Sequence, residues 1–265
     1  MRPLVPSDVN SMMRLKEAAA WNQTVADLQR NFVMEPEGHF GIDCDGVLAS
    51  TSSIFTYGQD LAWIGMVLTD PAFRARGFAR KLFAHCLDVL DARGIRCSKL
   101  DASSMGEPLY RTFGFEGEHP IERWVLSGLA PRAPAVLHTA SIDPGLDKIV
   151  FAADRKLFLD RLAPNGCIDL GNCQYAMGRH GSHAAYFGPM VALDPATARR
   201  GLDWFLGSSG QTSVYWDLFP SNAAALDLAK AYGFQPSRQL LRMRRGPKDA
   251  PDIQAMYAIA GFEYG

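Results

Sequence analysis

The sequence predicts a mixed α/β protein, with a mixed sheet, in which one structural unit occurs twice. Helical and strand-like hydrophobic patterns alternate along the first half, several short motifs recur in the second half, and a stretch rich in proline and alanine separates the halves. The 265 residues are enough for two domains of about 100–150 residues each. We therefore expect domains at residues 1–128 and 137–265, joined by a linker at 129–136.

Local signals define the elements of the first half in order. Asp45-Gly46 is a strong signal for a two-residue hairpin turn between two strands, and Gly94 is a typical helix terminator. The patterns predict a helix after Ser7-Asp8 through Ala19, a helix from Thr24 through Phe32, strands at 39–44, 47–55 and 63–69, a long helix over about 78–92, a strand at 95–100 and a short helix over 108–112.

The second half repeats three features of the first half in the same order. The repeats are MVLTDP at 66–71 with MVALDP at 190–195, Gly77 with Gly201 at the same offset, and YRTFGF at 110–115 with AKAYGF at 229–234. Any one of these matches can arise by chance, but three in one order indicate a duplicated unit.

Composition and charge exclude several classes of protein. Apolar residues make up 48% of the chain and charged residues 21%, as in an ordinary globular protein. The formal net charge of -1 provides no basic field for nucleic acid or an anionic membrane. No run resembles a signal peptide or a span of about 20 apolar residues, and the five cysteines lack metal-ligand spacing. We expect a cytoplasmic protein without metal, nucleic-acid or membrane partners; the oligomeric state is not indicated.

The junction after the third strand has the character of a phosphate cradle. A tight turn there opens a helix whose first residues are Gly77, Phe78 and Ala79, and small residues allow close approach of a ligand. The first N–H groups of a helix are free and lie at the positive end of its dipole. Three arginines add positive charge, namely Arg74, Arg76 and Arg80. The alternative is an ordinary strand-to-helix junction with surface arginines.

These residues resemble a motif of the GNAT superfamily of acyl-CoA N-acyltransferases. Arg74, Gly77 and Ala79 meet the motif R/Q-x-x-G-x-G/A, and residues 100–115 are similar to a second motif that ends Y-x-x-x-G-F. The resemblance covers most of residues 1–128, and the second half is similar to the C-terminal GNAT-like domain of tandem bacterial acetyltransferases. It implies two tandem GNAT folds and acetyl-CoA as the co-substrate.

The resemblance also implies roles for individual residues. The exposed backbone at Val67–Thr69 would pair with pantetheine and polarise the thioester, and the loop at Ala75–Ala79 would bind phosphates. Tyr110 falls where the family often keeps a tyrosine that protonates the leaving thiolate; a packed aromatic is the alternative. The expected coenzyme-binding residues are Val67, Leu68, Thr69, Arg74, Ala75, Arg76, Gly77, Phe78, Ala79, Arg80 and Ser103.

The general base is left open by the sequence. The family often places a glutamate on the fourth strand, but residues 63–68 contain no ionisable side chain. Asp101, His39, a group from the second domain, or water alone remain as alternatives.

Only the first copy is expected to bind coenzyme. Alignment of the copies places Ala198 at the position of Arg74 and Asp203 at that of Ala79, where a carboxylate would repel a phosphate. The second copy would then be structural or shape the acceptor pocket. Four residues are candidates for that pocket, with core packing and a strand end as alternatives: Trp21, Asn22, Trp216 and Asp217.

The resulting hypothesis is an acetyl-CoA-dependent N-acetyltransferase that acts on a primary amine of a small molecule, with Tyr110 as general acid. A second domain beside the site would restrict access for a folded protein. A non-catalytic acyl-CoA-binding module is the alternative from another class, and attack by a hydroxyl group is a third. The sequence indicates neither the acceptor nor the length of the acyl chain.

Overall fold

The computed structural model describes residues 1–130, 140–248 and 250–265, so most of the expected linker lies outside the described residues. The first half comprises β1 (Arg2–Pro3), α1 (Val9–Ala18), α2 (Val25–Met34), β2 (His39–Cys44), β3 (Val47–Tyr57), β4 (Leu61–Thr69), α3 (Phe78–Ala92), β5 (Cys97–Ala102), α4 (Glu107–Arg111) and β6 (Glu116–Ser127). The second half comprises α5 (Gly145–Phe151), α6 (Lys156–Leu162), β7 (Cys167–Gly171), β8 (Gln174–Arg179), β9 (Ala185–Val191), α7 (Pro195–Ser208), β10 (Ser213–Leu218), α8 (Ala223–Ala231), β11 (Gln235–Arg245) and β12 (Met256–Ala258). Short 3₁₀ helices are η1 (Pro6–Asp8), η2 (Pro71–Phe73) and η3 (Ala163–Asn165).

Two local features of the first half form where the sequence predicts them, whereas the strand predicted at 95–100 is observed at Cys97–Ala102. Asp45 and Gly46 have φ values of 53° and 78°, which a tight hairpin turn between β2 and β3 requires. Thr24 Oγ1 accepts a hydrogen bond from the Asp27 N–H, and the Asp27 carboxylate accepts one from the Thr24 N–H, so the capping box at α2 is closed. The mixed α/β class is confirmed.

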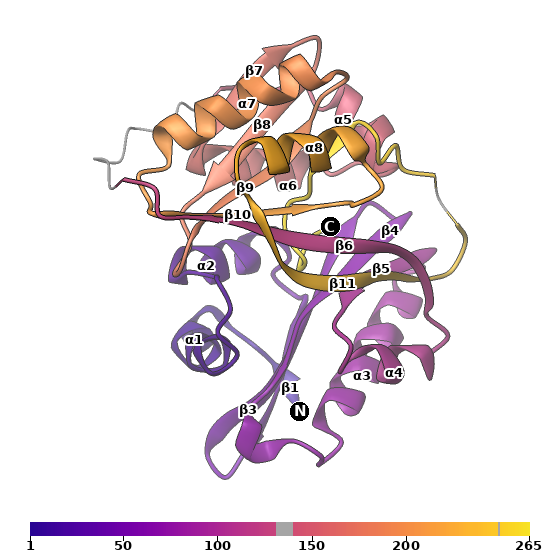
Figure 1. Cartoon of the computed structure of the whole chain (residues 1–265). Helices are drawn as coiled ribbons and strands as arrows, with labels where there is room; N and C mark the ends of the chain where they lie inside the picture. The colour runs from indigo at the N-terminus through magenta and orange to yellow at the C-terminus, as the bar shows by residue number, and fades with distance from the viewer. Residues whose placement is uncertain (131–139, 249) are drawn as a thin grey trace.

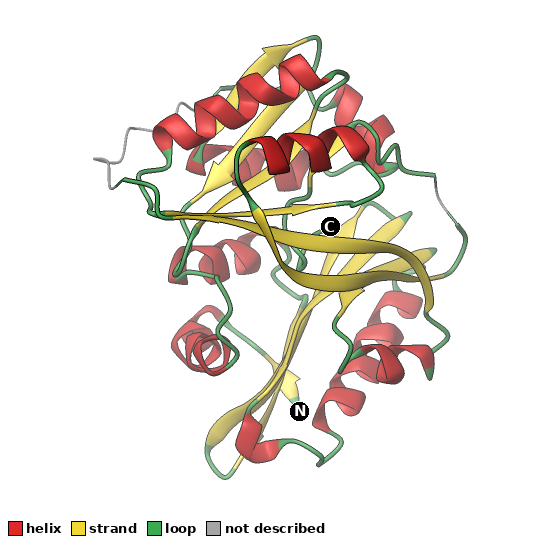
Figure 2. Cartoon of the chain, in the orientation of Figure 1, coloured by secondary structure: helices red, strands yellow, loops and turns green. Residues whose placement is uncertain are grey.

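The twelve strands of the described residues belong to one mixed sheet (Figure 2). Its order is β1-β2-β3-β4-β5-β11-β6-β10-β9-β8-β7, and β12 pairs with β9 beside this path. In the first half, α1 and α2 lie on one side of the sheet and α3 and α4 on the other (Figure 1). None of the helices within the described ranges has the length and apolar character that a bilayer span needs.

The two halves exchange their last long strands. β11, which follows α8, pairs antiparallel with β5 of the first half, while β6, which follows α4, pairs antiparallel with β10 of the second half. The exchanged strands also pair with each other at the centre of the sheet, where Figure 1 shows them crossing between the halves. Each half therefore completes its part of the sheet with a strand from the other half. The domain boundaries at residues 128 and 137 stay a prediction.

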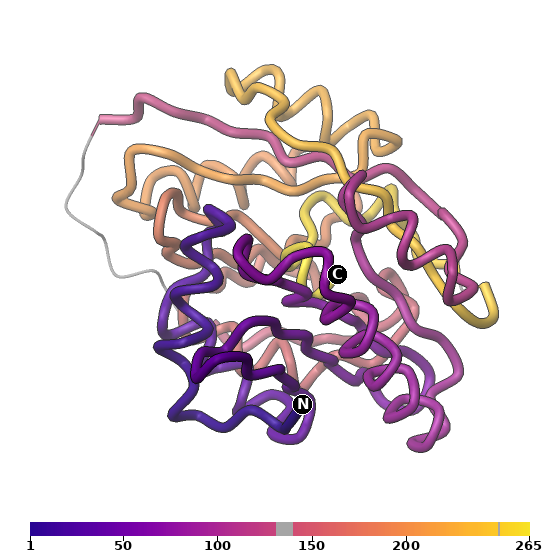
Figure 3. Tube along the Cα trace, turned by 90° about the horizontal axis from the view of Figure 1, so that it is seen from below, coloured from indigo at the N-terminus to yellow at the C-terminus, as the bar shows by residue number. Residues whose placement is uncertain are grey.

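The C-terminal segment, defined here as Met256–Gly265, connects the two halves internally. Its first part, β12, pairs with β9, and the N–H of Ile259 donates to the carbonyl of Asp217 on β10 at 3.0 Å. Its second part reaches the first half, where Trp63 Nε1 donates to the Phe262 carbonyl at 3.0 Å. Seen from below, the C-terminus lies near the middle of the molecule (Figure 3).

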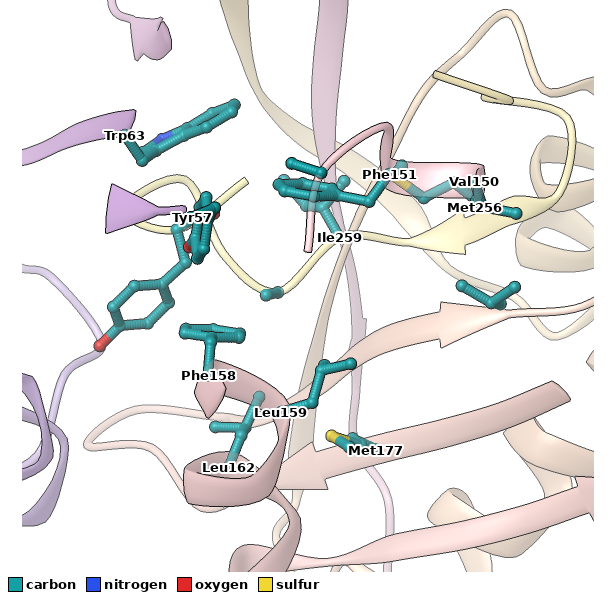
Figure 4. Close-up of a cluster of buried hydrophobic side chains, with 14 of the residues drawn as sticks. Tyr57, Trp63, Val150, Phe151, Phe158, Leu159, Leu162, Met177, Met256 and Ile259 are labelled. Atoms are coloured by element: carbon teal, nitrogen blue, oxygen red, sulfur yellow. The ribbon is translucent and has the colours of Figure 1, made fainter. Parts of the chain in front are cut away.

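A shared core surrounds this segment. Tyr57 and Trp63 from the first half pack in one buried cluster with Phe151 and Phe158 from the second (Figure 4). Ile259 of the C-terminal segment is fully buried in the same cluster. Because packed interiors resist deformation, this cluster holds the two halves in one fixed arrangement.

Each exchanged strand carries an arginine that pairs with a buried aspartate. Arg242 of β11 donates through Nε and Nη2 to both oxygens of Asp101 on β5, at 2.9 and 3.0 Å. Arg123 of β6 donates in the same way to Asp217 on β10, at 2.7 Å for both bonds. In each pair the two residues are direct cross-strand partners, so two-pronged ion pairs fix the register of the exchange.

We expect Arg242→Met to lower the free energy of unfolding by about 3–5 kcal/mol, because Asp101 would stay buried without a partner. The double variant Arg242→Met/Asp101→Leu removes both charges and should recover at least half of that loss. Urea denaturation of the full chain, followed by tryptophan fluorescence, measures both values. A double variant no more stable than the single one would contradict this account of the pair.

Candidate active site

The site begins where two parallel strands separate. β4 and β5 pair only through Leu61–Trp63. Further along, β4 bulges at Met66, which has a φ of 52° and lies at a shift in register with β3. The bulge restarts the alternation of side chains, so that Ile64 packs with α3 whereas Met66 packs with α1 and α2. Backbone groups of β4 beyond Trp63 are thus left facing an open space.

An open groove of about 700 Å³ extends along this part of β4 to the start of α3. It brings together every expected coenzyme-binding residue except Arg76: Val67, Leu68, Thr69, Arg74, Ala75, Gly77, Phe78, Ala79, Arg80 and Ser103. Tyr110 lines the same groove. Arg76 lies outside it, with its guanidinium 5.5 and 5.2 Å from the ring centroids of Phe73 and Phe78.

Gly77 gives the groove an anion-binding end. It is the N-cap of α3 with a φ of 77°, it provides no side-chain cap, and the space around its missing Cβ is open. The first-turn N–H groups of this 15-residue helix therefore remain available at the positive end of its dipole. This geometry fits a pyrophosphate, as the sequence predicts.

A second, smaller cavity of about 100 Å³, here called the inner pocket, lies between the two halves. It shares five lining residues with the groove, and these mark the junction of the two spaces: Trp21, Val67, Ser103, Tyr110 and Arg238. Its other walls include Ile64 and Asp101 from the first half and Leu240, Phe262 and Glu263 from the second. The inner pocket exists only because the halves interlock.

Tyr110 stands at the junction with its hydroxyl group free. Its ring packs against Phe83 with centroids 4.7 Å apart. Burial raises the pKa of the phenol well above its ordinary value, and the hydroxyl has no hydrogen-bond partner among residues 1–130, 140–248 and 250–265. The phenol is therefore protonated and able to donate a proton into the junction.

His39 and Asp101, two of the possible bases, have other partners. His39 is buried between Phe32 and Phe55, with Nδ1 2.8 Å from Ser53 Oγ, and lines neither space. Asp101 does line the inner pocket and burial raises its pKa, but Arg242 occupies both of its oxygens.

Glu263 supplies a carboxylate from the second half. The residue is buried, lines the inner pocket, and lies on the C-terminal segment. Its Oε1 is 3.6 Å from Arg179 Nη2, a long contact for an ion pair, and burial raises the pKa of the carboxyl group. Gly65 on β4 permits its approach, since a Cβ there would lie 2.7 Å from the Glu263 carbonyl oxygen.

The expected acceptor residues divide between pocket and core. Trp21 and Asn22 line the inner pocket, although the Asn22 amide also binds the backbone at 183–184 and so ties α1 to the second half. Trp216 and Asp217 are fully buried and line neither space. Sequence reasoning missed Arg123, Arg238, Phe262 and Glu263, which carry no local motif and reach the site through the strand exchange and the C-terminal segment.

The second half lacks the cradle for a reason that differs from the one expected. α7 begins at Pro195, close behind β9, and Asp194 caps it by accepting from the Thr197 N–H at 2.9 Å. Gly201 lies inside α7 and packs against Met190, so it has no role like that of Gly77. The alignment that placed Asp203 at the mouth of a cradle is therefore wrong. β12 also fills the gap that opens between β9 and β10.

Comparisons with known proteins agree with this geometry. The sequence model of the Acetyltransferase (GNAT) family matches residues 8–115, and that of an Acetyltransferase (GNAT) domain matches residues 145–258. Comparison with curated protein sequences gives no match.

Solved structures share the whole arrangement. A protein from Pyrococcus horikoshii, described only provisionally as an acetyltransferase, is 23% identical with a TM-score of 0.83, over 100% of this chain and 95% of its own. A GCN5-related N-acetyltransferase from Sphaerobacter thermophilus is 15% identical with a TM-score of 0.63, over 96% of this chain and 98% of its own. A tandem GNAT protein from the clavulanic acid biosynthesis pathway is 16% identical with a TM-score of 0.63, over 93% and 98%.

At these identities the structures establish the fold alone, whereas the sequence matches identify the family. The family uses acetyl-CoA, and two matched segments in tandem account for the duplicated motifs. The chain belongs to the GNAT family of acetyltransferases and contains two GNAT domains in tandem.

Proposed function

We propose that the first half transfers an acetyl group from acetyl-CoA to a primary amine of a small molecule, while the second half closes the acceptor pocket. One observation supports this most directly: the groove that gathers the coenzyme motif meets the inner pocket at Tyr110. A thioester in the groove would then lie within reach of an amine in the pocket.

The size of the inner pocket favours a small acceptor. Its volume is about 100 Å³, less than the engineered cavity of about 150 Å³ that binds benzene in another protein. Only a small group fits beyond the junction, and the C-terminal segment and Leu240 wall it on the side of the second half. A folded protein acceptor would have to present a narrow end.

The chemistry follows from the positions of three groups. The amine nitrogen attacks the thioester carbonyl, and backbone N–H groups at Val67–Thr69 stabilise the charge on the carbonyl oxygen. The new C–N bond forms as the C–S bond breaks, and Tyr110 gives its proton to the departing thiolate sulfur. The proton lost by the nitrogen must go to a base in the inner pocket.

Glu263 fits that role better than Asp101. Both carboxylates line the inner pocket, but a proton on Asp101 would disrupt its two hydrogen bonds from Arg242. Glu263 has a long contact to Arg179 and a side-chain hydrogen bond from Gln23, but no two-pronged ion pair, so it binds a proton at less cost than Asp101. The proposal therefore places the general base on the second half, at Glu263.

Turnover is favoured over the alternative of a non-catalytic binding module because a protonated phenol and a raised-pKa carboxylate line the same small space. The same two groups could also catalyse attack by a hydroxyl group on the thioester. Assays with a panel of amines and alcohols separate N-acetylation from O-acetylation. The cytoplasmic location and the absence of metal, nucleic-acid and membrane partners stay predictions from composition.

Coenzyme binding is tested at Gly77 with two variants of equal shape. Asn and Asp both tolerate a positive φ, so Gly77→Asn and Gly77→Asp differ chiefly in charge at the phosphate end. We expect acetyl-CoA to bind once per chain and about tenfold or more weakly to Gly77→Asp than to Gly77→Asn. Calorimetric titration measures both values, and two sites per chain would contradict the assignment to the first half.

Tyr110→Phe tests the general acid. Loss of the phenol proton should lower kcat about a hundredfold or more, while the dissociation constant of acetyl-CoA stays within about twofold, since the ring is retained. Steady-state release of coenzyme A and calorimetry measure the two effects. An unchanged kcat would assign Tyr110 to packing alone.

Glu263→Gln tests the general base through the pH profile. The wild-type kcat should rise with pH as Glu263 loses its proton, with a midpoint above the ordinary glutamate pKa because burial raises it. Glu263→Gln should lower kcat by about 10²–10⁴-fold and remove this limb. If the limb persists in the variant, another group such as Asp101 is the base.

A further inference from the structure

The inner pocket contains one charge without a partner. Four charged side chains line it: Asp101, Arg123, Arg238 and Glu263. The first two are held in two-pronged pairs with Arg242 and Asp217, and Glu263 faces Arg179. Within the part of the chain that the structure describes, Arg238 has no hydrogen bond, ion pair or ring contact.

The strand exchange keeps Arg238 unpaired. It lies on β11 directly opposite Arg123 of β6, and like charges at such positions destabilise a sheet. Arg123 has already committed Nε and Nη2 to Asp217. Arg238 as a whole is exposed, so its side chain is accessible to an anion; partial burial and the charge of Arg123 lower the pKa of its guanidinium, and Asp217 opposes that effect. An anion bound at this point would offset the repulsion between Arg238 and Arg123.

The position of Arg238 indicates which reactant brings the anion. It lines both the groove and the inner pocket, at the junction with Tyr110 and Val67. The phosphates of the coenzyme belong at the other end of the groove, near Gly77, and the pantetheine arm and thioester are uncharged. A negative group that binds Arg238 would therefore come from the acceptor.

We propose that the acceptor is an amine that also bears a carboxylate, and that Arg238 binds this carboxylate at the mouth of the inner pocket. The inference rests on the proposed function and adds the substrate class to it. A planar guanidinium donates two parallel hydrogen bonds to a carboxylate, which orients the acceptor with its amine near Tyr110 and Glu263. A phosphate is the other anion that this guanidinium could bind at the mouth, and the test below separates the two.

The test compares sets of amines that differ only at the carboxylate. An amino acid, its carboxamide and the corresponding decarboxylated amine are assayed by coenzyme A release with the wild type and with Arg238→Gln, Arg238→Lys and Arg161→Gln. Arg161 is an exposed arginine on α6 that lines neither space, so its variant is the control. A matched pair, ethanolamine and its phosphate ester, covers the other anion.

We expect the wild type to have its lowest KM for the carboxylate-bearing amine. Arg238→Gln should raise that KM about ten- to a hundredfold, as loss of a hydrogen bond to a charged group does, with little effect on the amides. Arg238→Lys should retain part of the preference, because it keeps the charge but not the fork. The dissociation constant of acetyl-CoA should be unchanged in all variants.

Other outcomes overturn the inference in distinguishable ways. Equal turnover of carboxylated and decarboxylated amines by the wild type would support the proposed acetyltransferase function but contradict the proposal that the acceptor needs a carboxylate. If Arg238→Gln lowers kcat for every amine, Arg238 acts on the thioester and not on the carboxylate of the acceptor. A lower KM for the phosphate ester of ethanolamine than for the carboxylate-bearing amine would show that Arg238 binds a phosphate and not a carboxylate. If acetyl-CoA binds but no amine is acetylated, the proposed function fails and the inference fails with it.

Discussion

Two arginine–aspartate pairs hold the molecule in the one arrangement that contains a site. Arg242 binds Asp101 across β11 and β5, and Arg123 binds Asp217 across β6 and β10, each at a direct cross-strand position. A slip of one residue would turn either arginine to the opposite face of the sheet. Buried ion pairs add little net stability compared with apolar packing, so their contribution here is register. Without that register the inner pocket loses two of its walls.

The duplication is used asymmetrically. In each half two parallel strands separate, β4 and β5 in the first and β9 and β10 in the second, but β12 occupies the gap in the second half while the gap in the first remains open as groove and pocket. The same segment then continues to Glu263 in the first half. One stretch of chain thus closes the second gap and contributes to the first. Among the described residues, the start of α7 is capped by the Asp194 side chain and does not reproduce the glycine cap of α3, and the second half provides several walls of the inner pocket.

Site residues that lie close together in the sequence could be predicted, whereas those brought together from distant parts of the chain could not. The groove residues from Val67 to Tyr110 follow one another in a local motif, and the structure gathers them. The pocket residues Arg238 and Glu263 are invisible to such reasoning because strand exchange decides their position; Arg242 and Asp101 are 141 positions apart. Local sequence reasoning also gave a false match. Gly201 aligns with Gly77 because both are glycines at the same offset, but Gly201 packs inside a helix whereas Gly77 caps one.

The exchange also has a consequence for how the chain is made on the ribosome. β5 is synthesised long before β11, the strand that pairs with its edge. The core of the first half is likewise incomplete until the C-terminal segment has been synthesised. Proteins of separate domains fold their N-terminal part first during synthesis, and here that route is closed. The nascent first half carries an unpaired strand edge, a known starting point for aggregation, for about half of the time of translation. The strand that covers this edge is therefore among the last to be made.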